Sequence, residues 1–240
     1  MNQLPLAIRL RERAVFGHFV AGSNGPLLEQ LHAVAAAAAS GVFWLAGEEG
    51  VGKSHLLQAT CAEALERQVE AVYLSLQQLK QFGPEALQGW PRARIVALDD
   101  IAAVLGDRGW EQALFGLYRE VEERHAALLI AARPPPLLLP FSLPDLASRL
   151  AAAQLLIVHR LDDSAQRQAL RLRAQARGME LPEETALYLQ RRFRRELPAL
   201  YELLDAIDEA ALRAQRRLTV PFIREVLAQR MPGGHSLTDD

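Results

Sequence analysis

The stretch from Phe43 to Ser54, FWLAGEEGVGKS, constrains the fold of this chain more than any other feature. Four apolar residues run into a glycine-rich turn that opens a helix-forming segment, which predicts a buried strand, a tight loop and a helix N-terminus. Gly47, Gly50 and Gly52 let the backbone N–H groups converge on a phosphate, and the helix N-terminus adds partial positive charge. The pattern G-x-x-x-x-G-K-S is therefore typical of a phosphate-binding loop.

The last two residues of this loop have predicted roles. Lys53 can reach the β- and γ-phosphates of a nucleotide, and the Ser54 hydroxyl can bind Mg²⁺, whose other ligands are water and phosphate oxygens. Among 27 lysine and arginine residues, only Lys53 and Lys80 are lysines, so a lysine at this position is not background composition. The alternative is a plain glycine-rich turn between a strand and a helix.

The hydrophobic pattern along the rest of the chain predicts a parallel sheet, because apolar strands alternate with helical segments. Besides the strand of the phosphate loop, the predicted strands are 71–74, 94–98, 127–131 and 155–158. The predicted helices are 26–39, 54–67, 110–124 and 145–150, followed by helices alone at 164–177, 182–194, 196–216 and 220–230. We therefore expect an α/β fold with a five-stranded parallel sheet, followed by a small all-α domain.

The expected organisation has four parts. Residues 1–14 form an extended arm, 15–159 the nucleotide-binding α/β domain, 160–230 the helical domain and 231–240 a disordered tail. A net charge of -2 gives no electrostatic reason for general affinity to nucleic acid. The single cysteine excludes a disulfide framework and a thiolate metal site. Neither a signal peptide nor the ~20 apolar residues of a membrane span are apparent, so we expect a cytoplasmic protein without membrane contact.

Two carboxylates, Asp99 and Asp100, follow an apolar strand downstream of the phosphate loop. Asp99 is predicted to hold Mg²⁺ through water, opposite the Ser54 hydroxyl. Asp100 is predicted to orient or activate the attacking water, although its side chain is one methylene shorter than that of glutamate. The alternative for both residues is capping of a turn.

These motifs and the helical domain resemble the DnaA clade of the AAA+ nucleotidases. The segment that contains Phe16 and Asn24 is similar to the one that surrounds adenine in that clade. Residues 143–150, LPDLASRL, are similar to the segment whose arginine reaches the nucleotide of a neighbouring subunit, which implies that Arg149 acts in trans. Arg195, within RREL, resembles the lid arginine that contacts the γ-phosphate in cis. The resemblance implies an adenine nucleotide, ADP or ATP, with Mg²⁺.

The N-terminal peptide QLPL indicates which branch of the clade the chain resembles. It is similar to the sliding-clamp-binding peptide of the Hda family, whose members are DnaA-related proteins that inactivate the replication initiator DnaA. The resemblance implies that Gln3, Leu4 and Leu6 contact the clamp. Taken alone, a four-residue peptide of this kind is more often an arm that packs on its own domain. The sequence also ends soon after the helical domain, where DnaA carries a helix-turn-helix domain, so no such domain is expected.

The resemblance implies a negative regulator of replication initiation. On the DNA-loaded sliding clamp (the β subunit of the polymerase), the nucleotide-bound protein would offer Arg149 to ATP held by DnaA, and hydrolysis would inactivate the initiator. DNA contact is expected through the clamp, and a homo-oligomer remains open. At the position where relatives have a small polar or acidic sensor, this chain has Ala132 and Arg133, so at most weak ATPase activity is expected.

Two other functions remain open at this point. One is a helicase-loader-like AAA+ ATPase, which would need a basic or aromatic loop for single-stranded DNA, and no such loop is apparent in the sequence. The other is a small-molecule phosphate-loop kinase, which has no apparent acceptor site here and would not explain QLPL or the segment that contains Arg149.

Overall fold

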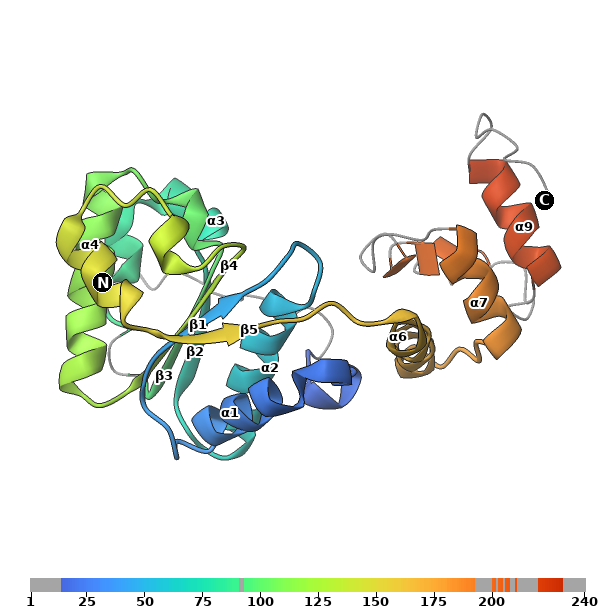
Figure 1. The fold of residues 1–240 in the computed structure, drawn as a ribbon, viewed down its shortest axis with the longest axis horizontal. Helices are drawn as coiled ribbons and strands as arrows, with labels where there is room; N and C mark the ends of the chain where they lie inside the picture. The colour runs from blue at the N-terminus through green and yellow to red at the C-terminus, as the bar shows by residue number, and fades with distance from the viewer. Residues whose placement is uncertain are drawn as a thin grey trace. The chain divides into compact units, whose positions relative to one another are not determined.

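Figure 1 shows the computed structural model of the chain, which describes residues 14–90, 93–192, 200, 201, 203, 204, 206, 207, 210 and 220–230. The chain divides into two compact units, with the boundary between Arg160 and Leu161. The first unit is α/β and the second is helical, which confirms the expected fold class. In the part of the chain that the structure describes, no helix is long and apolar enough to cross a membrane.

The first unit is built on five parallel strands in the order β2-β3-β4-β1-β5. The strands are β1 (Gly41–Ala46), β2 (Ala71–Ser75), β3 (Ile95–Asp99), β4 (Ala127–Ala132) and β5 (Gln154–Ile157). Each predicted strand is therefore observed, with small shifts at its ends. Because all five strands run the same way, their carboxyl ends meet at one edge of the sheet, and ligands of open α/β sheets bind at this edge.

Helices cover both faces of this sheet (Figure 1). One face carries α1 (Gly25–Ala35) and α2 (Lys53–Glu66), and the other carries α4 (Arg108–Glu123) and α5 (Pro144–Ala151). The N-cap of α4 is Asp107, whose carboxylate accepts hydrogen bonds from the N–H groups of Gly109 and Trp110. The short helix α3 (Leu76–Leu79) and the 3-10 turns η3 (Lys80–Phe82) and η4 (Pro84–Leu87) were not predicted, because they lack a full period of apolar residues.

The alternation of side chains along β1 divides the core into two clusters. Phe43 and Leu45 pack with α1 and α2, whereas Trp44 and Ala46 pack on the opposite face with α4. All four side chains are 3% exposed or less. The strand that leads into the phosphate loop is thus held from both sides.

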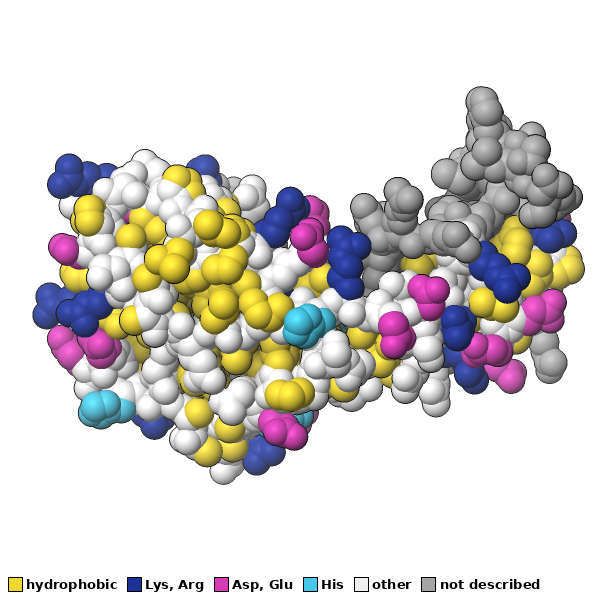
Figure 2. Space-filling view, viewed as in Figure 1, with side chains coloured by type: hydrophobic (Ala, Val, Ile, Leu, Met, Phe, Trp, Pro, Cys, Tyr) yellow, Lys and Arg dark blue, Asp and Glu magenta, His cyan; other side chains and the backbone are white. Residues whose placement is uncertain are grey.

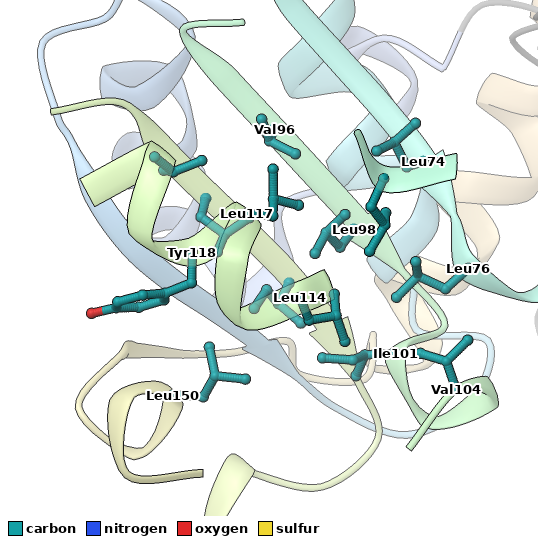
Figure 3. Close-up of a cluster of buried hydrophobic side chains, with 14 of the residues drawn as sticks. Leu74, Leu76, Val96, Leu98, Ile101, Val104, Leu114, Leu117, Tyr118 and Leu150 are labelled. Carbon is teal, nitrogen blue, oxygen red and sulfur yellow. The ribbon is translucent and has the colours of Figure 1, made fainter. Parts of the chain in front are cut away.

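Figure 3 shows the core on the α4 face. Val96 and Leu98 of β3 meet Leu114 of α4, and Leu150 of α5 lies in the same cluster. Each of these side chains is nearly or fully buried, and full burial of a leucine stabilises a fold by roughly 1.5–3 kcal/mol. Leu150 therefore anchors α5 to the sheet and leaves the preceding residue, Arg149, at the surface.

The second unit contains α6 (Asp163–Ala176), α7 (Glu183–Arg192) and α9 (Val220–Arg230). Its core is a separate cluster that includes Leu170, Leu189, Leu204 and Ile223. These helices agree with the predicted ones at 164–177, 182–194 and 220–230. The predicted helix 196–216 falls mostly outside the described residues.

Candidate nucleotide-binding site

The phosphate loop connects the carboxyl end of β1 to the first turn of α2, and its glycines are required by geometry. Gly50 and Gly52 have φ values of 77° and 101°, a left-handed region that glycine adopts without strain. A Cβ at Gly47 would lie 2.7 Å from the carbonyl oxygen of Val158, and one at Gly52 would lie 2.8 Å from the ring of Phe19. All three predicted glycines therefore hold positions where a side chain would clash or strain the backbone.

Lys53 is the first residue of α2, and its side chain folds over the loop. Its Nζ donates hydrogen bonds to the carbonyl oxygens of Gly47 and Glu48, both at 2.7 Å. Desolvation lowers the pKa of Lys53, and the charge of Asp99 acts in the opposite direction. The ammonium thus lies where bound phosphates would contact it, and the neighbouring Ser54 side chain is exposed and accessible to a metal ion.

Asp99 ends β3 at the same edge of the sheet and is only 3% exposed. Its Oδ2 accepts a hydrogen bond from the Tyr73 hydroxyl at 2.7 Å, and its Oδ1 accepts one from the N–H of Asp100 at 3.0 Å. Burial, and then the Asp99 charge, raise the pKa of Tyr73, so its hydroxyl remains a donor. Asp99 therefore presents a carboxylate of fixed orientation on the side of the sheet that faces α2.

The chemistry of these groups fits Mg²⁺, a cation that prefers oxygen ligands and keeps several waters. Ser54 would supply a hydroxyl oxygen and Asp99 a carboxylate. Within the described ranges, no group of three or more histidine, cysteine, aspartate or glutamate side chains could hold a metal ion. A magnesium ion here would take its remaining ligands from water and from the nucleotide phosphates, where it would neutralise phosphate charge.

Asp100 has φ 58° and ψ 41°, a left-handed conformation that is uncommon for a residue other than glycine. Such residues are frequent at functional sites. The Ser75 hydroxyl lies 3.5 Å from the Asp100 carboxylate. Desolvation and the adjacent Asp99 charge raise the pKa of Asp100. The side chain is exposed beside Asp99, and its water-orienting role stays a prediction.

The segment predicted to surround adenine lies next to this loop. Phe16, in η1 (Phe16–His18), packs against His32 of α1 with ring centroids 4.3 Å apart. A cavity of about 600 Å³ opens beside Phe16 between η1, α1 and α2. Phe19, which belongs to the same predicted segment, is the aromatic side chain next to Gly52, and its ring lies 6.0 Å from that of His55.

Asn24 connects this segment to the end of β5. Its side-chain amide donates to the carbonyl oxygen of His159 at 3.1 Å, and its Oδ1 accepts from the N–H of the same residue at 2.7 Å. The side chain is 1% exposed. Both the nitrogen and the oxygen of the Asn24 side-chain amide therefore form hydrogen bonds within the protein. Contact between Asn24 and the adenine of a nucleotide stays a prediction.

Arg149 lies at the opposite edge of the sheet from the phosphate loop. It is in the last turn of α5, shortly before β5 begins, and its Nη1 is 3.8 Å from the Glu122 carboxylate. Glu122 is in the last turn of α4, shortly before β4 begins, so both residues are near the amino ends of the strands. A six-residue strand such as β1 separates the two edges by about 20 Å. Arg149 therefore lies at the end of the strands that is far from its own phosphate loop.

Glu111 fixes the start of the helix that carries Arg149, a function that no sequence pattern indicated. Its side chain is 0% exposed. Oε1 accepts hydrogen bonds from the N–H groups of Gly106 at 2.8 Å and Ser142 at 3.0 Å, and Oε2 accepts one from Leu143 at 2.6 Å. Leu143 is the N-cap of α5, so this buried carboxylate joins α4 to the first turn of α5.

The remaining predicted site residues, Gln3, Leu4, Leu6 and Arg195, lie outside the described residues. Among the described ones, the structure brings Gly47, Lys53, Ser54 and Asp99 to one edge of the sheet.

Solved structures of similar fold were found for nearly the whole chain. Domain III of the replication initiation protein DnaA from Thermotoga maritima matches with a TM-score of 0.78 and 18% identity, covering 90% of this chain and 96% of that one. AMPPCP-bound DnaA from Aquifex aeolicus matches with a TM-score of 0.69 and 20% identity, covering 86% and 70%. The RuvB Holliday junction branch migration motor from Thermotoga maritima matches with a TM-score of 0.67 and 15% identity, covering 92% and 73%.

With a phosphate loop at the carboxyl edge of a parallel sheet, and a helical unit that follows the sheet in sequence, the chain has the AAA+ fold, in the form found in DnaA. Residues 163–227 match the family described as "Hda, lid domain". The helical unit is therefore an Hda-type lid, and the resemblance to Hda that the sequence indicated is confirmed.

Proposed function

We propose that this DnaA-related protein is a negative regulator of replication initiation that supplies Arg149 to ATP bound by DnaA. The observation that carries the proposal is the position of Arg149, which is exposed and lies at the edge of the sheet opposite its own phosphate loop. A guanidinium supplied from outside neutralises charge on the transferring phosphoryl group, an effect worth ~10³–10⁵ in rate. Arg149 would thus accelerate hydrolysis in a partner.

The weak ion pair of Arg149 supports this proposal. An ordinary helix arginine would pair with Asp145, four residues earlier, but the Arg149 guanidinium lies near Glu122 of α4. The two atoms are 3.8 Å apart, and both side chains are more than half exposed. Exposed pairs contribute roughly 0–1 kcal/mol, so a phosphoryl group of a partner can displace Glu122 at little cost.

The surface beside α5 also supports contact with another protein. Two leucines of η6 (Pro136–Leu138), which packs against α5, are among the most exposed apolar side chains described: Leu137 at 80% and Leu138 at 73%. Leu155 and Ile157 of β5 are 44% and 42% exposed. Figure 2 shows apolar side chains gathered on this face, over β5 and the segment between β4 and α5. Contiguous exposed apolar surface of this kind marks interaction sites.

The resident ligand in this proposal is an adenine nucleotide, ADP or ATP, with Mg²⁺. The phosphate loop, Lys53 and Asp99 support it, and a DnaA of the same fold is described as bound to AMPPCP. The proposal also includes the sliding clamp, contacted through Gln3, Leu4 and Leu6, with DNA reached through the clamp. The resemblance of QLPL to the clamp-binding peptide of the Hda family supports that part.

The test measures hydrolysis of ATP preloaded on DnaA, in single turnover, with clamp, DNA and the purified chain. We expect Arg149→Ala to bind nucleotide and clamp normally and to lower the stimulated rate by at least about tenfold, because a trans arginine contributes ~10³–10⁵ in rate. Arg119→Ala is the matched control, because Arg119 is an exposed α4 arginine that pairs with Glu123 at 3.5 Å. Equal stimulation by Arg149→Ala and the wild type would refute the proposal.

One observation favours a second function, a helicase-loader-like ATPase that grips single-stranded DNA. Phe82 is 53% exposed on η3, and Lys80 on the same turn is exposed, so an aromatic and basic turn exists that the sequence did not reveal. Bases stack on such rings in single-strand-binding proteins. Salt-dependent binding of single-stranded DNA that is lost in Phe82→Ala would favour this function. If the chain binds no single-stranded DNA, the regulatory function stands as the proposal.

A further inference from the structure

A hydrogen bond between two neighbouring strands holds the carboxylate that ends β3. Tyr73 lies on β2, which is the neighbour of β3, and its hydroxyl donates to Asp99 Oδ2 at 2.7 Å. Burial raises the pKa of Tyr73, whereas Gln58, one helical turn after Ser54 on α2, acts to lower this pKa by a smaller amount. Tyr73 and Asp99 therefore connect two strands at the carboxyl edge of the sheet.

Register explains why the tyrosine reaches the carboxylate. Tyr73 is paired with Ala97, and Ser75 is paired with Asp99, so all four side chains belong to the same face of the sheet. A long side chain at position 73 can extend to the end of the neighbouring strand. The same face packs against α2, the helix that begins at Lys53 of the phosphate loop.

The hydroxyl completes the orientation of Asp99. The terminal torsion of an aspartate is broad, so a carboxylate with one partner can still rotate. In this structure, Oδ1 accepts from the N–H of Asp100 and Oδ2 accepts from Tyr73, which fixes the plane of the carboxylate. Each oxygen has two acceptor sites, so each keeps one for a metal-bound water.

We infer that Tyr73 is a positioning residue for Mg²⁺: its hydroxyl holds Asp99 in the orientation that receives the water shell of a nucleotide-bound magnesium ion. This inference rests on the proposed binding of nucleotide with Mg²⁺. Partners that orient a metal-holding carboxylate typically contribute about 10–100-fold to metal affinity. The tyrosine acts only through Asp99, so it should leave metal-free nucleotide binding unchanged.

The test is Tyr73→Phe, which removes one oxygen and keeps the ring. Calorimetry gives the affinity for ADP in Mg²⁺ and in EDTA. For Tyr73→Phe we expect the wild-type affinity for ADP in EDTA. The increase in ADP affinity on adding Mg²⁺ should be about tenfold smaller than in the wild type. Tyr118→Phe is the matched control, because it removes a hydroxyl that bonds to Glu122 at 3.1 Å on α4, and it should leave both affinities unchanged. Thermal melting shows that each variant is folded.

A double-mutant cycle separates this function from a purely structural hydroxyl. If Tyr73 acts through Asp99, adding Tyr73→Phe to Asp99→Asn causes no further loss of magnesium dependence, because residues in one hydrogen-bonded network are not additive. Additive losses, or a Tyr73→Phe variant with wild-type magnesium dependence, would overturn the inference while the proposed function stands. A wild-type protein that binds no ADP in Mg²⁺ would overturn the proposed function and this inference together.

Discussion

Substitution of Glu111 should loosen the helix that carries Arg149 and destabilise the α/β unit. This carboxylate is fully buried and accepts three backbone hydrogen bonds, from Gly106, Ser142 and Leu143. Two of these donors immediately precede α5. Glu111→Gln keeps the size of the side chain and replaces one of its oxygens with a donor group. The perturbation is therefore confined to hydrogen bonding and charge.

The magnitude follows from the bonds that change. With the amide oxygen facing Gly106 and Ser142, the amide nitrogen of glutamine would face the N–H of Leu143, donor against donor. A hydrogen bond to a charged group contributes ~1.5–3 kcal/mol, and an unsatisfied buried donor costs ~1–3 kcal/mol. Allowing for relaxation, we expect a loss of roughly 3 kcal/mol. At ~2–4 °C per kcal/mol for a unit of this size, the melting temperature should fall by roughly 6–12 °C.

The assay is thermal unfolding followed by circular dichroism, with stimulated ATP hydrolysis by DnaA as the second measurement. Glu120→Gln, an exposed position on the same helix, is the matched control and should change the melting temperature by less than about 2 °C. Glu111→Gln should also stimulate hydrolysis less than the wild type at a temperature where it is folded, because α5 is released. A Glu111→Gln variant as stable as the control would show that these three bonds do not hold α5.

Three further results are expected. Lys53→Ala should lose binding of adenine nucleotide in calorimetry, because phosphate charge is then matched only by backbone dipoles; wild-type affinity would contradict the phosphate-loop assignment. Cys61 is 3% exposed, and burial raises its pKa to about 12, so the native protein should resist alkylation at pH 8 and react fully in denaturant. Alanine at both Gln3 and Leu6 should abolish the complex with the sliding clamp and leave the melting temperature unchanged; a pull-down that still retains the clamp would contradict the arm's predicted function.

Features encoded by short-range patterns could be predicted from the sequence. The phosphate loop, the five strands and the carboxylates after β3 each depend on neighbouring residues, so Lys53, Ser54 and Asp99 were found without the structure. Arg149 was located through its resemblance to a known segment. Only the register of the sheet and the contact with Glu122 show that Arg149 lies far from its own phosphate loop.

Features that depend on contacts distant in sequence could not be predicted. Tyr73 bonds to a residue 26 positions away, and Glu111 bonds to residues 31 and 32 positions away. On sequence alone, Tyr73 is an ordinary strand aromatic and Glu111 is an ordinary charge on an amphipathic helix. The contact of Phe19 with Gly52 could not be predicted for a similar reason, since it depends on how η1 folds back onto α2.

Hydrolysis of the chain's own nucleotide should depend on the residues at the end of β4. Ala132 ends β4 at the position predicted for the sensor and has no polar atom that could orient a water molecule. The next residue, Arg133, lies 2.6 Å from the Glu49 carboxylate of the phosphate loop. Both charged side chains are exposed, so this pair contributes roughly 0–1 kcal/mol, and a γ-phosphate can replace Glu49 as the partner of Arg133.

An arginine that contacts the γ-phosphate binds charge, but it is always protonated and cannot accept a proton from the attacking water. We therefore expect the isolated chain to hydrolyse ATP slowly in single turnover. Arg133→Ala should weaken ATP binding more than it changes the rate at which bound ATP is hydrolysed. Glu49→Gln is the matched control, because it removes the ion pair and keeps the guanidinium. If Arg133→Ala lowers the rate from bound ATP by more than about tenfold, a difference of 1.4 kcal/mol in the barrier, Arg133 performs the task of the missing sensor and the chain is an ATPase in its own right.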